Sequence, residues 1–244
     1  MSVAFWAVIP AAGVGRRMGG GCPKQYLELL GRPVIAWTLE RLLAHPRVSG
    51  AVVALAPEDP YWGGVEHGAQ KPVYRADGGA ERSDSVLAAL RRLARVAGAE
   101  DRVLVHDAVR PCLGAAELDR LLAEGGEAAD GALLATPVRD TLKRGEAGQG
   151  GGPAVAATVD RSGLWQAQTP QLFPLGQLTA ALEEALESGA AVTDEAQAVE
   201  RHGGRPRLVS GDPANLKITQ PADLALAAAI LRAQSAAGPQ GEGA

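Results

Sequence analysis

The sequence predicts an α/β fold built on a largely parallel sheet, and three observations lead to this prediction. Short apolar runs typical of buried strands alternate along the 244 residues with segments of helical periodicity. A glycine-rich turn directly follows the first apolar run, Val3–Ile9. One stretch, residues 138–160, breaks the alternation and indicates a hairpin that projects from the sheet.

The expected elements follow from these patterns in chain order. The strand candidates are short and apolar: Val3–Ile9, Ala51–Ala56, Val73–Arg75, Arg102–His106, Ala132–Thr136 and Arg207–Val209. The helix candidates carry apolar residues three or four positions apart: Pro33–Ala44, Asp84–Ala97, Ala115–Ala123, Leu178–Glu187, Asp194–His202 and Ala222–Ala233. Together they predict one domain over residues 1–234, followed by a disordered tail over 235–244.

The segment between Val138 and Asp160 has no helical pattern. Two strands, Arg139–Lys143 and Ala154–Val159, are expected on either side of the glycine-rich loop Gly145–Gly152. A long hairpin with a polar tip cannot bury itself and usually packs against a partner. The alternative is a loose insertion without a partner.

Composition narrows the class of protein. A net charge of −4 argues against a nucleic-acid partner, which normally requires a basic face. No uncharged stretch reaches the length of a membrane helix, and Pro10 and Gly13 interrupt the only run that resembles a signal peptide. Cys22 and Cys112 lie far apart and form neither a zinc spacing nor a disulfide framework. We therefore expect a cytoplasmic protein with no membrane contact.

The most informative stretch is Gly13-Val14-Gly15-Arg16-Arg17-Met18, followed by Pro23-Lys24-Gln25. A glycine-rich turn after a strand exposes backbone N–H groups that can bind phosphate oxygens, and glycine lets a polyphosphate approach the backbone. The positive charges of Arg17 and Lys24 strengthen this interpretation over a solvated surface loop.

Two familiar nucleotide loops do not fit this stretch. The dinucleotide fingerprint needs a glycine where Met18 stands and an acidic residue about 20 positions further on, but Leu29–Leu39 contains no acidic residue. A Walker A loop needs Ser or Thr after the lysine, and Lys24 is followed by Gln25. A triphosphate cradle of another kind remains.

Three further clusters can carry chemistry. Residues 76–85 include a Gly-Gly turn that opens a helix and should offer free N–H donors, with Ser85 either capping the helix or contacting a ligand. His106-Asp107 ends a strand, and because side chains alternate along a strand, Asp107 should face a ligand while His106 is structural. Asn215–Thr219 is expected to end a late strand and carries the single Lys217.

These residues resemble the 2-C-methyl-D-erythritol 4-phosphate cytidylyltransferase family. Besides Pro10–Met18 and Pro23–Tyr26, the matching blocks are Val138-Arg139-Asp140-Thr141, Thr158–Trp165, Gln168-Thr169-Pro170-Gln171 and Val192-Thr193-Asp194-Glu195, in family order from Ala7 to about Leu231. One departure is Ala80, where many members have an acidic residue. The family's contact there would then use the backbone or be weakened.

The resemblance implies a Rossmann-like three-layer α/β/α nucleotidyltransferase fold, with a mostly parallel sheet and a projecting β-arm that clasps a second subunit. It implies transfer of a cytidylyl group from CTP to 2-C-methyl-D-erythritol 4-phosphate, with Mg²⁺ or another divalent cation and no assigned metal ligand. The implied catalytic residues are Arg17, Lys24 and Lys217. The implied nucleotide-binding residues are Ala11, Ala12, Gly13, Gly15, Arg17, Lys24, Gly79, Ala80, Ser85, Ala108 and Lys217. The implied residues for the erythritol phosphate are Asp107, Arg110, Thr141, Arg161, Thr169, Thr193 and Lys217, with Arg161 acting across a homodimer.

Two other functions are compatible with part of this pattern. A nucleotidyltransferase of similar fold, of the sugar-phosphate or molybdenum-cofactor type, shares the glycine-rich loop and its cations but lacks the blocks around Arg161 and Thr169. A module that only binds CTP would have no use for cations that stabilise a transient charge. Both alternatives are weaker than the cytidylyltransferase.

Overall fold

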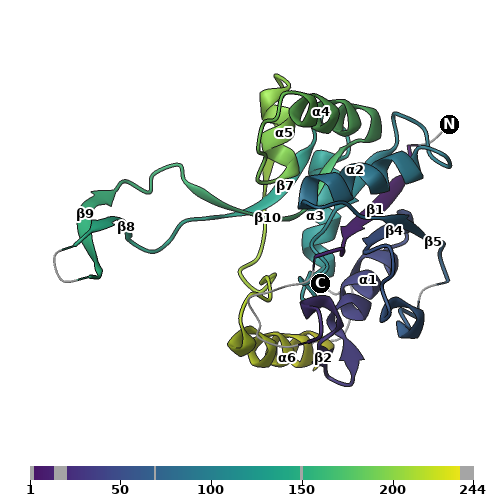
Figure 1. Cartoon of the computed structure of the whole chain (residues 1–244), viewed down its shortest axis with the longest axis horizontal. Coiled ribbons are helices and arrows are strands. Elements are labelled where there is room, and N and C mark those ends of the chain that lie inside the picture. Colours follow the sequence, from purple (N-terminus) through teal and green to yellow (C-terminus); the bar gives the residue numbers. More distant parts are fainter. Residues whose placement is uncertain (1–2, 14–20, 69, 149–150, 237–244) are drawn as a thin grey trace, which may run out of the picture.

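The computed structural model describes residues 3–13, 21–68, 70–148 and 151–236. Its centre is a seven-stranded sheet in the order β11-β7-β10-β6-β1-β4-β5 (Figure 1). The strands are β1 Phe5–Pro10, β4 Val48–Leu55, β5 Val73–Asp77, β6 Arg102–Val105, β7 Ala132–Pro137, β10 Trp165–Pro174 and β11 Arg207–Ser210. Neighbours pair in parallel except at β10, which is antiparallel to both β6 and β7. The predicted mostly parallel sheet and its six predicted strands are confirmed.

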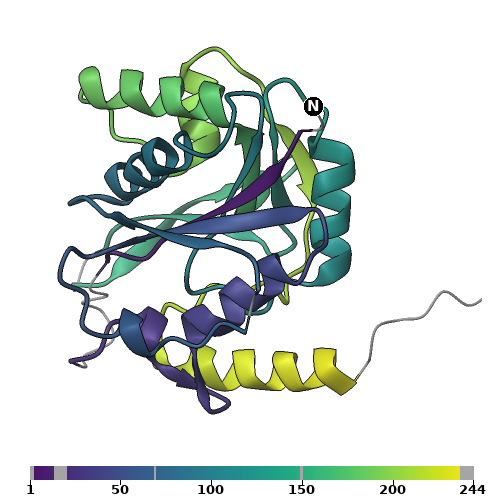
Figure 2. The same ribbon diagram turned by 90° about the vertical axis from the view of Figure 1, so that its right-hand side faces the viewer.

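Helices cover both faces of the sheet (Figure 2). They are α1 Val34–Leu43, α2 Arg82–Leu93, α3 Ala115–Gly125, α4 Leu175–Glu187, α5 Glu195–Arg201 and α6 Pro221–Ala236. Along β1, Ala7 and Ile9 join the core under α1 and α3, whereas Trp6 and Val8 join the core under α2, α4 and α5. This alternation follows from the two-residue period of a strand, and it produces the predicted three layers.

Strand β10 was not expected from the sequence. Pro170 lies inside it and has no backbone N–H to donate to a neighbouring strand, so the local sequence does not predict a strand here. The structure accommodates the proline at an irregularity, because the pairing of β10 with β7 shifts register between Ala167 and Gln171. The Thr169–Pro170 peptide in this gap is cis.

The predicted arm is present between β7 and β10. Strands β8 Leu142–Ala147 and β9 Pro153–Val159 pair as an antiparallel hairpin that reaches away from the rest of the chain (Figure 1). Most of its side chains are exposed, including Val155 at 65%. The hairpin therefore buries little against its own chain. Its first strand lies three residues later than expected.

The remaining elements flank the sheet. Two-residue strands β2 Glu28–Leu29 and β3 Arg32–Pro33 form a small hairpin, and Lys24–Tyr26 and Trp62–Gly64 are short 3₁₀ helices. Helix α6 packs Ala227 and Leu231 into a third core with Val34, next to the start of α1. It ends at Ala236, so two residues of the predicted tail are helical, and the rest of that tail lies outside the described residues. No helix in the described part of the chain is long and apolar enough to cross a membrane.

Candidate active site

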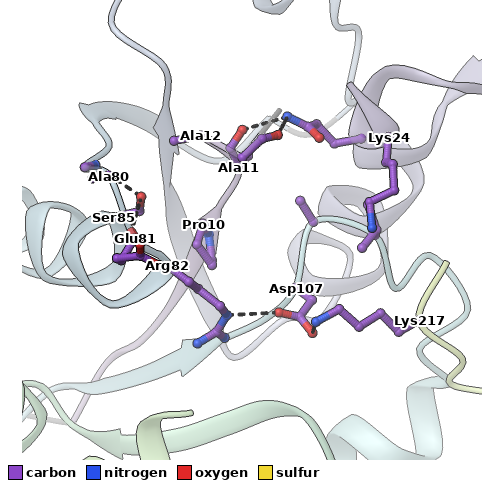
Figure 3. Close-up of a pocket in the computed structure, with 15 residues that line it drawn as sticks. Pro10, Ala11, Ala12, Lys24, Ala80, Glu81, Arg82, Ser85, Asp107 and Lys217 are labelled. Atoms are coloured by element: carbon purple, nitrogen blue, oxygen red, sulfur yellow. Dashed lines mark hydrogen bonds and ion pairs between the residues drawn. The ribbon is translucent and has the colours of Figure 1, made fainter. Parts of the chain in front are cut away.

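The first wall of the site follows β1. The chain leaves the strand at Pro10, and the Ala11 amide donates to the Ala54 carbonyl at 2.8 Å. The buried side chain of Gln25 donates from Nε2 to the carbonyl oxygens of Ala11 at 2.7 Å and Gly13 at 3.2 Å. Gln25 thus holds the start of the predicted phosphate loop, and the short helix that contains it presents Lys24 to the same space (Figure 3).

A tyrosine pair supports this short helix from behind. The Tyr26 hydroxyl donates to Asp59 Oδ2 at 2.8 Å, and the Tyr61 ring stacks on Tyr26 with centroids 5.1 Å apart. Burial, and then the hydrogen bond with Asp59, raise the pKa of the Tyr26 hydroxyl. The phenol therefore stays neutral and keeps donating to Asp59. The short helix that carries Lys24 is thus held by Gln25, which binds the start of the loop, and by Tyr26, which binds Asp59.

The second wall is the Gly78-Gly79 turn between β5 and α2. A side chain at Gly78 would place its Cβ 2.4 Å from the Ala12 Cβ, so only glycine lets the first two walls approach this closely. The expectation of free N–H donors here is wrong for both glycines. Gly78 donates to the Leu55 carbonyl at 2.7 Å, and Gly79 donates to Ser85 Oγ at 3.2 Å.

Ser85 does not cap α2. Its hydroxyl donates to the Glu81 carbonyl at 3.1 Å, while a capping box between Glu81 and Asp84 satisfies the helix start. This capping box explains why α2 begins two residues before the predicted helix. Ala80 lies in the turn and lines the cavity (Figure 3), and its side chain is a methyl group in place of a carboxylate.

The third wall follows β6 and meets a later loop. Asp107 lies just beyond the strand end, as predicted. Lys217 was expected at the end of a strand, and this is wrong, because it lies in the loop between β11 and α6. That loop is held from both sides instead: the Ile218 amide donates to the Val109 carbonyl, and the buried Asn215 donates from Nδ2 to the Thr169 carbonyl.

These walls enclose a cavity of about 480 Å³. Nine predicted nucleotide-binding residues line it, namely Ala11, Ala12, Gly13, Lys24, Gly79, Ala80, Ser85, Ala108 and Lys217. The other two predicted residues, Gly15 and Arg17, lie outside the described residues. The cavity lies at the carboxyl ends of β1, β5 and β6, where the chain order switches from one side of β1 to the other. Open α/β sheets bind ligands at this kind of position.

A second cavity of about 200 Å³ adjoins the first and shares Asp107, Lys217 and Arg82 with it. Five residues predicted to hold the erythritol phosphate line it: Asp107, Arg110, Thr169, Thr193 and Lys217. Thr141 and Arg161 do not line it. Both are exposed and lie at the arm that leaves the sheet.

Three cations surround the carboxylate of Asp107. Lys217 Nζ lies 3.0 Å from Oδ2 and Arg82 Nε lies 3.3 Å from Oδ1 (Figure 3). Arg110 Nε lies 3.3 Å from Oδ2. Burial alone would raise the pKa of Asp107, but the charges of Arg82, Lys217 and Arg110 outweigh it and lower the pKa. The carboxylate is therefore held ionised at neutral pH.

His106 faces away from the cavity, as the alternation of side chains predicts. It is fully buried, with Nδ1 2.9 Å from Thr169 Oγ1 and Nε2 3.1 Å from the Arg110 carbonyl oxygen. The Asp107 amide donates to the same Thr169 hydroxyl at 3.1 Å. His106 thus organises the wall of the second cavity from behind.

The described residues do not form a metal cage. None of them gathers three histidine, cysteine or acidic side chains suited to a metal ion. Asp107, the carboxylate at the junction of the cavities, already pairs with three cations. The donor set present fits a cation carried by the ligand's own phosphates better than a resident ion.

Sequence reasoning did not assign three side chains that shape the site: Gln25, Arg82 and Glu195. Each lies in a stretch already singled out, within two positions of a residue that was chosen. Gln25 follows Lys24, Arg82 starts the helix after the Gly-Gly turn, and Glu195 follows Thr193 and Asp194. The sequence does not show that Glu195 is buried, so no local signal marked it; only its burial in the structure shows that the carboxylate needs a partner.

Comparison with known proteins decides the family. The sequence matches the family described as 2-C-methyl-D-erythritol 4-phosphate cytidylyltransferase over residues 5–233. The chain belongs to this family. The enzyme of that name from Halorhodospira halophila is 69% identical over 237 residues, covering 96% of each chain, and one from Pseudomonas putida is 53% identical, covering 91% of this chain and 93% of its own. A solved structure of a 4-diphosphocytidyl-2C-methyl-D-erythritol synthase has a TM-score of 0.81 at 41% identity, covering 95% of this chain and 100% of the other.

The sequence resemblance to the cytidylyltransferase family is therefore confirmed, together with the nucleotidyltransferase class of the fold. The match extends from β1 to the last turns of α6, so it includes the glycine-rich loop, the arm and the Lys217 loop. Every wall of the two cavities lies inside the matched range.

Proposed function

We propose that the chain transfers a cytidylyl group from CTP to 2-C-methyl-D-erythritol 4-phosphate in isoprenoid precursor biosynthesis, releasing pyrophosphate. The observation that carries this proposal is a pair of adjoining cavities in a member of the cytidylyltransferase family. One is lined by nine of the eleven residues expected to hold CTP and the other by five of the seven residues expected to hold the acceptor phosphate. Asp107 and Lys217 line both, so the two ligands meet at a shared wall.

The reaction is a direct in-line displacement. A phosphate oxygen of the acceptor forms a bond to the α-phosphorus of CTP, and the bond from that phosphorus to the bridging oxygen breaks. Pyrophosphate leaves with the electron pair. No side-chain nucleophile is required, so the chain acts by positioning its ligands and stabilising charge.

Lysine side chains supply the charge stabilisation in the described part of the site. Lys24 lines the nucleotide cavity from the short helix after the loop, and Lys217 lines it from the loop between β11 and α6 (Figure 3). The proposal places Lys217 near the α-phosphate of CTP. Arg17 adds a third cation by resemblance. Ala11, Ala12, Gly13, Gly15, Gly79, Ala80, Ser85 and Ala108 hold the nucleotide, with backbone groups contacting cytosine.

Mg²⁺ enters with CTP in this proposal and neutralises part of the triphosphate charge. The absence of a protein cage among the described residues supports delivery by the nucleotide. Every other role assigned here belongs to the chain's own residues: they bind, orient and stabilise charge.

The arm mediates a homodimer in the same proposal, and Thr141 and Arg161 complete the acceptor cavity of the other subunit. Its support is the exposure of β8 and β9, together with exposed Val155, Leu164 and Trp165. A cytoplasmic location is also proposed. Both cysteines are free, and burial raises the pKa of the Cys112 thiol to about 11, which keeps it unreactive.

Pyrophosphate release tests the activity. Mixing the protein with CTP, Mg²⁺ and 2-C-methyl-D-erythritol 4-phosphate should release pyrophosphate continuously, and Lys24→Ala should lower kcat by about 10²–10³, as removal of one oxyanion donor does. Lys71→Ala is the matched control, because Lys71 binds the His45 carbonyl away from both cavities. Turnover with GTP or a hexose 1-phosphate, and none with CTP, would overturn the proposal. A Lys24→Ala effect confined to KM would overturn the role of Lys24.

A further inference from the structure

Arg82 stands where the two cavities meet. It opens α2, directly after the Gly-Gly turn, and its side chain lines both the nucleotide cavity and the acceptor cavity. Figure 3 shows its guanidinium extending from α2 toward Asp107, on the opposite side of that carboxylate from Lys217. It is not among the residues assigned to CTP or to the acceptor.

Glu195 holds the guanidinium in place. Arg82 Nη1 and Nη2 donate to Glu195 Oε1 and Oε2 at 2.5 and 3.0 Å, a fork that fixes the plane of the guanidinium. The Glu195 side chain is only 1% exposed. Glu195 is the first residue of α5 and Arg82 is the first residue of α2, so the pair joins the starts of these two helices. Burial would lower the pKa of Arg82, but Glu195 and Asp107 outweigh it and raise the pKa.

The third donor of Arg82 contacts Asp107 on its other oxygen. Arg82 Nε lies 3.3 Å from Oδ1, whereas Arg110 and Lys217 both contact Oδ2. Without Arg82, only Oδ2 would have cationic partners, and the carboxylate could turn toward Lys217 and Arg110. Lys217 would then be drawn away from the ligands.

Stability alone gives little reason to bury Glu195 beside Arg82, whose side chain is 31% exposed. Desolvating a carboxylate often costs more than its attraction to a cation returns, so apolar residues would serve a purely structural contact at least as well. The fork, in contrast, supplies a defined direction. The three cations and two carboxylates of this cluster also leave a net positive charge, which suits a phosphate ligand.

We propose that Arg82 is a positioning residue for the acceptor cavity: held by Glu195, it orients the Asp107 carboxylate and thereby the Lys217 ammonium. The proposal rests on the proposed cytidylyl transfer. It assigns to Arg82 and Glu195 a larger effect on the phosphorylated acceptor than on CTP. The reason is that Asp107 also pairs with Arg110, which lines only the acceptor cavity, whereas Lys24 lines only the nucleotide cavity.

Initial rates with each substrate varied separately test this assignment. Arg82→Met, which removes the charge, should lower kcat/KM for the acceptor by about tenfold to a hundredfold, the size of effect expected for a misplaced reacting group. The affinity for CTP, measured by calorimetry, should change by less than about threefold. Arg82→Lys should retain intermediate activity, since it keeps the charge and loses the fork.

Glu195→Gln should act in the same direction as Arg82→Met. The double variant should have the same kcat/KM for the acceptor as Arg82→Met alone, because both substitutions break the same Arg82–Glu195 pair. Arg91 and Glu183 provide the matched control: this pair also joins α2 to another helix, at 2.8 Å, but it is 62% and 40% exposed and lies outside both cavities. Arg91→Met and Glu183→Gln should leave both kinetic constants unchanged.

The pH profile separates the charge of Arg82 from the geometry of its fork. Asp107 faces Arg82, Arg110 and Lys217, and His106 precedes it in the chain. Removing the Arg82 charge raises the pKa of Asp107, so the acid limb of kcat/KM should move to higher pH in Arg82→Met. Arg82→Lys keeps the charge and loses the fork, so it should lower kcat/KM for the acceptor and leave that limb in place.

Two outcomes would overturn the assignment of Arg82. One is an equal loss of affinity for CTP and acceptor, and the other is an Arg82→Met protein that behaves like Arg91→Met. If Arg82→Met fails to fold by circular dichroism, Arg82→Lys and Glu195→Gln carry the same comparisons. A wild-type protein that releases no pyrophosphate overturns the proposed function instead. In that case, acceptor binding by calorimetry in wild type and Glu195→Gln still decides the role of the pair.

Discussion

His106 determines which way the hydrogen bonds run behind the acceptor cavity. The Arg110 carbonyl can only accept, so Nε2 of the neutral ring carries the proton and Nδ1 accepts from the Thr169 hydroxyl. That hydroxyl already accepts from the Asp107 amide. Thr169 can therefore offer a ligand only a lone pair, which suits a hydroxyl of the acceptor rather than its phosphate.

The protonation of His106 gives a prediction at this scale. Burial, which outweighs the attraction of Asp107, lowers the pKa of His106 to about 4. The neutral ring stabilises the folded protein fully above about pH 6.5, and this contribution, roughly 3 kcal/mol, is lost as pH falls toward 4, because the unfolded chain binds the proton first. Imidazole nitrogen signals in NMR should show the Nε2–H form unchanged from about pH 8 to 5. A midpoint near 6.5 would contradict the buried network.

The direction in which a side chain points was predictable where backbone geometry alone decides it. Asp107 and His106 face opposite ways because they are neighbours at the end of a strand, and the structure bears this out. Lys217 was predicted on a strand and lies in a loop, since its place depends on contacts from Asn215 and Ile218 to distant parts of the chain. The partners of Gly79 depend on Ser85, six positions away, and no local pattern shows that bond.

The arm is the element with the most direct functional test. If Arg161 completes the partner's cavity, Arg161→Ala and Lys24→Ala homodimers each have both sites damaged. A mixed dimer then has one site with both lesions and one with neither, by two-fold symmetry. Mixing the two variants under conditions of subunit exchange should restore activity, up to about half per site in the mixed dimers.

Subunit exchange has to be measured independently, for example by native mass spectrometry of a tagged variant. A mixture that exchanges subunits and stays as inactive as its parents would show that Arg161 serves its own subunit. Arg161→Ala alone should raise KM for the acceptor and leave CTP binding nearly intact, because a guanidinium fork pairs with a phosphate.

Elements with a strong local pattern were predicted, and β10 was not. The buried faces of α1, α2 and α3 repeat every three or four residues, so their periodicity is visible without the fold. Strand β10 contains Pro170 and is interrupted between Ala167 and Gln171, so it depends on pairing with β6 and β7 on both sides. A strand whose hydrogen bonds come from distant strands leaves a weak local signal.

Across the whole molecule, the ligand cavities and the hydrophobic core lie in different places. The nucleotide cavity is formed by loops at one edge of the sheet, whereas Leu90 of α2 is fully buried in the core with Val8 and Val105. The same helix thus contributes Arg82 to the site and Leu90 to the core, at positions separated by about two turns. A substitution in the core should therefore lower the free energy of unfolding without changing the affinity for CTP.

This separation gives a prediction for ligand-linked stability. Leu90→Ala should lower the free energy of unfolding by about 2–5 kcal/mol, since it leaves a cavity in a closed core. CTP with Mg²⁺ at 100 times its dissociation constant should add about 2.7 kcal/mol to wild type and to Leu90→Ala alike, because the ligand binds only the folded state. Chemical denaturation with and without CTP measures both quantities. Leu226→Ala is the control, because Leu226 is 55% exposed on α6 and should change stability by about 0.5 kcal/mol or less. A CTP increment that shrinks in Leu90→Ala would mean that the core and the nucleotide cavity are coupled through α2.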